Sequence, residues 1–241
     1  MSGPEPSTPG PSDPPEIRAV LLDAGNTLVF VDRERLFSIF AEVGVEGDER
    51  RFVEAELEAR LNLTRRVEAG DSGTEAHVWK EYFYRMFAGC GVPEGVVEQV
   101  GQRLREEHER EHLWTRVEEG TAEALARARE TGVRLGVISN ADGRVEALLR
   151  KVGLRGEVEF VVDSHVVGVE KPDPRIFLEG VRRMGLRPDE CLYVGDLYPV
   201  DVVGARRVGM RALLLDPTGR LDRPVPRIPS VLELPEFLDG G

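Results

Sequence analysis

Short apolar runs that alternate with helical stretches constrain the fold of this chain more than any other feature of its sequence. The runs show no alternation of polar and apolar residues, which is typical of strands buried on both faces of a parallel sheet. They lie at residues 18–23, 134–139, 158–163, 191–196 and 211–216, with helical stretches at 121–130, 143–152, 174–184 and 200–208. This order predicts an α/β fold: a doubly wound, Rossmann-like parallel sheet with helices on both faces.

One long segment interrupts the alternation. Between residues 32 and 116 the apolar residues recur with helical periodicity, as in Leu36, Ile39, Phe40 and Val43, and we find no strand candidate. Three or four helices inserted after the first strand would stand over the strand ends as a lid that excludes water. The sequence therefore predicts a disordered proline-rich tail at 1–16, an α/β core at 17–31 and 117–241, and an all-helical cap at 32–116.

The composition excludes several classes of protein. The chain has 241 residues, 41% of them hydrophobic and 32% charged, which is typical of a globular protein with a sizeable core. The net charge of −12 disfavours nucleic acid and anionic lipid as partners. No apolar run is long enough for a membrane span, and the N-terminus does not resemble a secretory signal. Cys90 and Cys191 lie far apart in the sequence, so we expect a cytoplasmic protein.

Polar residues close three of the predicted strands. Asp23, Ser139 and Asp196 each stand at a carboxyl end, the edge at which parallel sheets bind ligands. A single aspartate in this position is often only a solvated turn residue. Three such side chains on neighbouring strands would form a site.

Four short patterns, in order, resemble the haloacid dehalogenase (HAD) superfamily of hydrolases. They are Leu21-Leu22-Asp23-Ala24-Gly25-Asn26-Thr27-Leu28, then Val137-Ile138-Ser139-Asn140, then Lys171-Pro172-Asp173-Pro174, and lastly Val194-Gly195-Asp196 followed by Asp201. The resemblance covers residues 18–216, and the inserted helices look like the cap of the subfamily that carries it after the first motif. It implies a Mg²⁺-dependent enzyme, most simply a phosphatase that acts on a small-molecule phosphate ester.

The resemblance also implies a role for each motif residue. Asp23 is expected to attack phosphorus and form an aspartyl-phosphate, which divides one difficult displacement into two easier ones. Mg²⁺ is expected on Asp23, the backbone carbonyl of Gly25 and Asp196, with Asp201 as a ligand or just behind the ligands. The catalytic set is completed by Ser139 and Lys171, and the phosphate oxygens are expected to contact Asn26, Ser139, Asn140 and Lys171.

Lys171 stands out in a chain that contains only three lysines among its 32 basic residues. A compact ammonium group can be shared by a phosphate oxygen and a carboxylate where a planar guanidinium fits differently. The simpler alternative is a charge that flanks a helix, because Asp173 and Pro174 form a helix start. We favour the functional role, since the same helix start would hold the lysine in place.

Gly25 departs from the phosphatase pattern, in which the residue two after the nucleophile is usually an aspartate that protonates the leaving oxygen. Loss of a general acid costs on the order of 10² to 10⁴ in rate. Haloacid dehalogenases also lack this aspartate, but they carry serine-asparagine where this chain has Gly195-Asp196, and a bulky aromatic residue in place of Gly25. Some relatives with a similar first motif are phosphatases. The alternatives are therefore a dehalogenase and a weakly active, ligand-binding relative.

A second motif belongs to another enzyme class. Residues 108–112 match the zinc-binding pattern H-E-x-x-H, in which two histidines share one helix face. Only His77 and His165 could supply a third imidazole, and the surrounding residues are mostly charged. The pattern therefore favours a solvated helix that leads from the cap back to the core. Neither the substrate nor the choice between a monomer and a homodimer can be read from the sequence.

Overall fold

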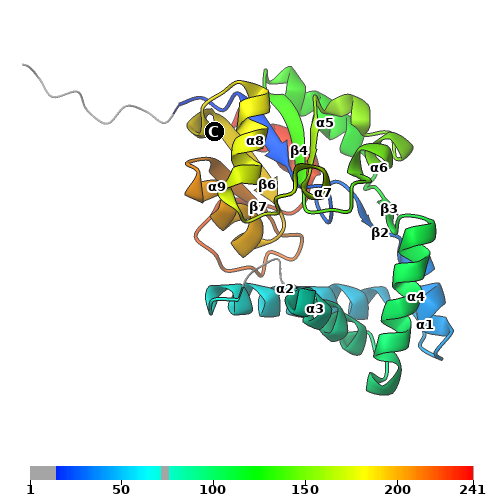
Figure 1. Cartoon of the computed structure of the whole chain (residues 1–241). Coiled ribbons are helices and arrows are strands. Elements are labelled where there is room, and N and C mark those ends of the chain that lie inside the picture. The colour runs from blue at the N-terminus through cyan, green and yellow to red at the C-terminus, as the bar shows by residue number, and fades with distance from the viewer. Residues whose placement is uncertain (1–14, 72–75, 241) are drawn as a thin grey trace, which may run out of the picture.

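The computed structural model describes residues 15–71 and 76–240, so most of the predicted tail lies outside the described residues. Its central feature is a six-stranded parallel sheet with the order β5-β4-β1-β6-β7-β8 (Figure 1). The strands are β1 (Ala19–Leu22), β4 (Arg134–Ser139), β5 (Val161–Asp163), β6 (Cys191–Gly195), β7 (Arg211–Leu215) and β8 (Arg227–Ile228). The predicted α/β class with a parallel sheet is confirmed.

Helices cover both faces of this sheet. Val20 and Leu22 pack with α5 (Thr121–Glu130), α6 (Val145–Lys151) and α10 (Leu234–Asp239). Ala19 and Leu21 point the other way and pack with α8 (Pro174–Met184) and α9 (Val203–Arg207). Successive residues of β1 therefore face two separate cores, which is why the run shows no alternation.

The start of α8 follows its sequence signals. The Asp173 carboxylate accepts a hydrogen bond from the Arg175 N–H at 2.9 Å, and Pro174 occupies the first helical position. Gly185 ends the helix in a left-handed conformation, φ 65°, which a residue without Cβ adopts at little cost. Lys171 lies two residues before Asp173, the N-cap residue of α8, and is thus attached to a well-defined helix terminus.

Short elements escaped the sequence prediction. β8 has two residues, and α7 (Ser164–Val167) has four. Neither is long enough to show a period. The predicted strand at 158–163 is also shorter than expected. Val158 directly follows a 3₁₀ turn at Arg155–Glu157, and although the Glu159 N–H donates to the Leu135 carbonyl, the regular ladder with β4 begins at Val161.

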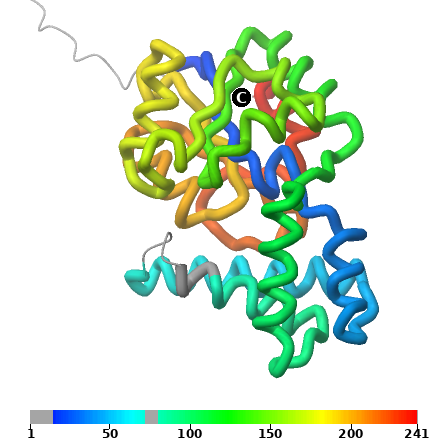
Figure 2. The backbone as a smooth tube through the Cα atoms, turned by 45° about the vertical axis from the view of Figure 1, so that its right-hand side comes forward, coloured from blue at the N-terminus to red at the C-terminus, as the bar shows by residue number. Residues whose placement is uncertain are grey.

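Helices make up most of the inserted segment: α1 (Arg33–Ala41), α2 (Glu49–Glu68), α3 (Ala76–Gly89) and α4 (Val97–Arg110). The expectation of no strand between 32 and 116 was wrong, since β3 (Trp114–Arg116) pairs antiparallel with β2 (Phe30–Val31). Three residues are too few for the alternation that identifies a strand. This pair joins the cap to the core, and Figure 2 shows the two connecting segments of the chain next to each other.

The cap has its own core and also rests on the sheet domain. Phe40, Phe52 and Phe87 are buried inside it. Leu57, on α2, instead belongs to the buried apolar cluster of the sheet domain, which also contains Leu21 and Tyr193. Figure 1 shows α2 and α3 beneath the sheet domain and α4 rising towards β3. Helix α2 therefore lies between the two cores.

Candidate active site

The site lies at the carboxyl ends of three adjacent strands. In the sheet β1 is flanked by β4 and β6, with Leu22 level with Val137 on one side and Val194 on the other. Asp23 directly follows β1, Ser139 ends β4 and Asp196 directly follows β6. All three residues are buried. The structure thus brings together the three strand-end residues that the sequence singled out.

Lys171 lies at the centre of this group and is buried. Its Nζ is 2.8 Å from Asp23 Oδ1 and 2.8 Å from Asp201 Oδ1, and it donates a hydrogen bond to the Tyr193 hydroxyl at 3.0 Å. The two carboxylates hold the pKa of the ammonium group above its usual value although burial opposes this. Lys171 is therefore a permanently charged group between two acidic ones.

Asn140 positions Lys171 through its backbone. Its side-chain N–H donates to the Lys171 carbonyl at 2.9 Å, and its side-chain oxygen accepts from the Lys171 N–H at 2.6 Å. Both ends of the amide are thus occupied within the protein. We expected Asn140 to contact phosphate; here it also holds the lysine, and the second N–H of its side-chain amide and its backbone N–H are the donors that a phosphate contact would use.

Three carboxylates meet beside this lysine. Oxygen atoms of Asp23, Asp196 and Asp201 lie within 4.8 Å of one another, and all three residues are buried. Burial, with the neighbouring Asp201 charge, raises the pKa of Asp23 to about 6 although Lys171 opposes the change. Burial likewise raises the pKa of Asp196 to about 7, against the opposing charge of Arg60. Concentrated negative charge of this kind favours a bound cation.

Asp201 is held in place on both oxygens. Oδ1 pairs with Lys171, and Oδ2 accepts a hydrogen bond from the Leu197 N–H at 2.9 Å. The carboxyl group lies over the α-carbon of Gly195, so closely that a Cβ at position 195 would overlap it. A glycine is therefore required at the end of β6. With both oxygens engaged, Asp201 suits a place just behind the metal ligands.

The donor set fits Mg²⁺. A hard cation prefers oxygen ligands, and the cluster offers Asp23 and Asp196 at the strand ends with Gly25 in the adjoining loop. Asp196 Oδ2 is buried and pairs with Arg60 Nη1 at 3.3 Å, but it accepts no hydrogen bond from the described part of the chain, so it keeps acceptor capacity for a cation.

Arg60 is a residue of this site that the sequence analysis missed. It projects from α2 of the cap, is buried, and places Nη1 3.3 Å from Asp196 Oδ2 and Nη2 3.1 Å from Glu56 Oε1. Its Nε has no hydrogen-bond partner among the described residues. Nothing in the local sequence separates Arg60 from the many other arginines. Only the packing of the cap on the core reveals it.

Gly25 and Asn26 form the loop after β1. Asn26 has a left-handed backbone, φ 52°, and its N–H donates to the Val29 carbonyl at 2.8 Å. A Cβ at Gly25 would come no closer than 3.7 Å to another side chain, and that neighbour is Nε1 of Trp114. A Cβ at position 25 would therefore fit, so packing does not require a glycine here.

The histidines of the H-E-x-x-H motif are half-buried, whereas Glu109 is exposed. His108 Nε2 lies 3.2 Å from Asp142 of the core. Burial lowers the pKa of both imidazoles, that of His112 to about 4. The expectation of a fully solvated helix is therefore wrong at its carboxyl end, because the helix packs there against the loop after β4.

The fold and this cluster define an α/β protein with a capped, strand-end acidic site. The family model of haloacid dehalogenase-like hydrolases matches residues 17–209, and the chain belongs to this family. The described helices include none with the length and apolarity to span a bilayer.

Individual relatives agree with this assignment. Mouse haloacid dehalogenase-like hydrolase domain-containing protein 3 is 37% identical over 63% of this chain and 61% of its own length. The glyceraldehyde 3-phosphate phosphatase of Methanopyrus kandleri is 43% identical over 36% of this chain and 37% of its own. A HAD phosphatase structure from Thermococcus onnurineus superimposes with a TM-score of 0.58 at 25% identity, over 93% of this chain and 99% of that one.

Proposed function

We propose that this hydrolase is a Mg²⁺-dependent phosphatase that cleaves a small phosphomonoester through an aspartyl-phosphate on Asp23. The observation that carries the proposal is the buried group of Asp23, Asp196 and Asp201 around Lys171. The names of the relatives from Methanopyrus kandleri and Thermococcus onnurineus, both phosphatases, support it.

Asp23 and Lys171 have direct parts in the proposed reaction. Asp23 Oδ1 is held by the Ala24 N–H at 2.7 Å and by Lys171, which leaves Oδ2 to attack phosphorus while the bond to the leaving oxygen breaks. Lys171, with the Ser139 hydroxyl, stabilises charge on the transferring phosphoryl oxygens. Water then attacks the acyl phosphate, which releases inorganic phosphate and restores the Asp23 carboxylate.

Mg²⁺, held by Asp23, the Gly25 carbonyl and Asp196, would neutralise the repulsion between the carboxylates and the phosphate. Arg60 of the cap contacts one of these ligands, Asp196, at 3.3 Å. Since Trp114 rather than an acidic side chain faces Gly25, we infer that the leaving group departs without a proton from position 25. Phosphates with low-pKa leaving groups, such as aryl or acyl phosphates, are then the favoured substrates.

Phosphate release from sugar phosphates, nucleotides, phosphoglycolate and aryl phosphates, with and without Mg²⁺, tests the proposal. We expect Mg²⁺-dependent release that falls at least about 10³-fold in Asp23→Asn. The matched control is Asp222→Asn, which removes an exposed carboxylate elsewhere and should leave the rate unchanged. Equal release by metal-stripped protein, or metal-independent release of chloride from a 2-haloacid, would overturn the proposal.

A further inference from the structure

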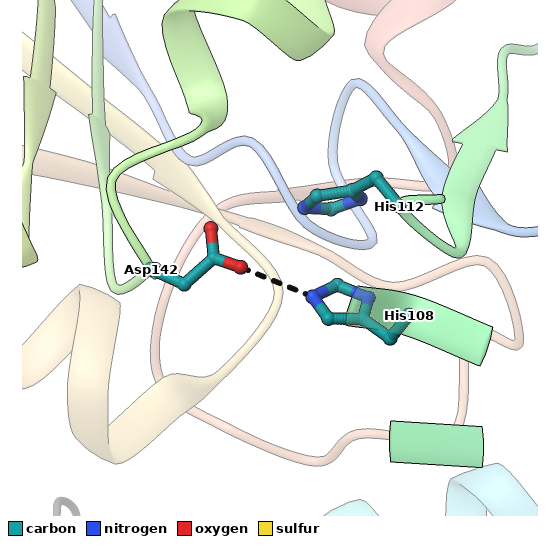
Figure 3. Close-up of side chains that lie close together, drawn as sticks. All are labelled: His108, His112 and Asp142. Atoms are coloured by element: carbon teal, nitrogen blue, oxygen red, sulfur yellow. Dashed lines mark hydrogen bonds and ion pairs between the residues drawn. The ribbon is translucent and has the colours of Figure 1, made fainter. Parts of the chain in front are cut away.

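A second group of ligand-type side chains lies outside the carboxylate cluster. His108 is in the last turn of α4, His112 lies just beyond that helix, and Asp142 is in the loop after β4. Their ligand atoms lie within 4.8 Å of one another. Figure 3 shows both rings and the carboxylate converging from opposite sides of the boundary between cap and core.

We propose that His108, His112 and Asp142 bind a transition-metal dication such as Zn²⁺. Imidazole nitrogen suits Zn²⁺, whereas Mg²⁺ prefers sites built only of oxygen. Two ligands of a tetrahedral zinc ion lie roughly 3.3 Å apart, and His108 Nε2 is already 3.2 Å from Asp142 Oδ2. Three protein ligands would leave a fourth position for water.

Backbone contacts orient both rings. The Leu113 N–H donates to His108 Nδ1 and the Trp114 N–H donates to His112 Nδ1, each at 3.2 Å. These contacts turn both Nε2 atoms towards Asp142 (Figure 3). Binding through Nε2 moves the proton of each neutral ring to Nδ1 and breaks these two contacts. Both are at the long limit for a hydrogen bond, so we expect two metal–nitrogen bonds to outweigh them.

Arg144 orients the third ligand. Its Nε donates to Asp142 Oδ2 at 2.7 Å, and its Nη1 donates to the His108 carbonyl at 3.0 Å. Carboxylates that bind metals usually keep such a second partner. Arg144 Nη2 also lies 2.5 Å from Oδ2 and the Arg144 N–H donates to Oδ1 at 3.2 Å, so a metal ion on Oδ2 would share that atom with Arg144. The positive charge of Arg144 makes the site weaker than one with an unpaired carboxylate.

The position of the site gives it a mechanical consequence. Helix α4 leads out of the cap towards β3, and the loop after β4 also carries Asn140 beside Ser139. A metal ion on both segments would link the cap to the loop of the candidate active site. We therefore expect occupancy to restrict cap opening.

Zinc bound per full-length chain, measured by equilibrium dialysis and elemental analysis in excess Mg²⁺, tests the inference. We expect one equivalent for the native protein and at least about tenfold weaker binding for His112→Gln and Asp142→Asn. Co²⁺ in place of Zn²⁺ should give the intense visible absorption of a four-coordinate site. Circular dichroism of each variant verifies that it is folded.

Three further variants separate this site from its alternatives. Glu109→Gln should bind zinc normally, because Glu109 is exposed and is not one of the three ligands; the glutamate of H-E-x-x-H is a general base. His165→Gln alters an exposed histidine outside the group and should also bind normally. Asp23→Asn should still bind one equivalent of zinc, which separates zinc binding from the proposed phosphatase activity. No stoichiometric zinc in the native protein, or equal affinity in folded His112→Gln, would overturn the inference.

Discussion

Among the described residues, Lys171 and Arg60 are the two cations that pair with the three buried aspartates of the site. Two positive charges do not balance three negative ones in a region with little water, so protonation remains accessible to Asp23 and Asp196 near neutral pH. The site therefore suits a bound cation, and without one the unbalanced negative charge lowers the stability of the folded protein.

That cost predicts a pH dependence of stability. A carboxyl group whose pKa is higher in the folded protein contributes stability that is present below the unfolded value of 3.8 and is lost as the pH rises through the folded value. The folded values are about 6 for Asp23 and about 7 for Asp196. Metal-free protein should thus lose stability between about pH 4 and pH 7.

Thermal unfolding at a series of pH values, with and without Mg²⁺, measures this effect. The stabilisation by Mg²⁺ should be larger at about pH 8 than at about pH 5, because the ion competes with protons for the same oxygens. Asp196→Asn removes one of the two groups and should flatten the pH dependence of the metal-free protein. If stability of the metal-free variant changed with pH as steeply as that of the native protein, Asp196 would not be one of the groups responsible.

Gly25→Asp tests the missing proton donor. A Cβ at this position clears Trp114 Nε1 by 3.7 Å, and the added carboxyl group would supply an acid to the leaving oxygen, so turnover of alkyl phosphates should rise by tenfold or more. Aryl phosphates should change little, because their leaving groups need no proton. Rates for a series of esters, plotted against leaving-group pKa, measure the difference. A native enzyme no more sensitive to that pKa than the variant would refute the idea.

At the scale of elements, α2 places the guanidinium group of Arg60 in the site, beside Asp196. Arg60→Ala leaves Asp196 buried without its partner, and loss of one member of a buried pair costs about 3–5 kcal/mol. Mg²⁺ on Asp196 would replace the lost charge. The free energy of unfolding should therefore fall markedly without Mg²⁺ and much less with it. Arg65→Ala, on the exposed part of the same helix, is the control and should show no such metal dependence.

How far the sequence predicts an element depends on its length and on what it contacts. β4 and α8 have the predicted bounds, since an apolar run and a complete helix start are local signals. β3 and β8 are too short to carry a local signal and are defined only by pairing with β2 and β7. For the same reason the sequence places Asp23, Ser139 and Lys171 in one site but cannot identify Arg60 or pair Asp142 with His108.

At the scale of the whole molecule, two cores share helix α2. Leu57 is buried against the sheet domain and Leu63 is buried inside the cap. Leu63→Ala should destabilise the cap by roughly 2–5 kcal/mol. Leu57→Ala should chiefly weaken closure of the cap, and thus raise KM for a small ester several-fold with a smaller change in the unfolding temperature. Steady-state kinetics and thermal unfolding of both variants measure the contrast. Indistinguishable effects would mean that the cap and core do not move separately.

Gly195 shows how strictly this architecture constrains its own variation. The space in which any other amino acid would carry its first side-chain carbon is filled by the carboxyl group of Asp201. Even alanine would push that group away from Lys171, its partner at 2.8 Å. A saturation library read out by activity should consequently lose every replacement at this codon, including those that still yield folded protein.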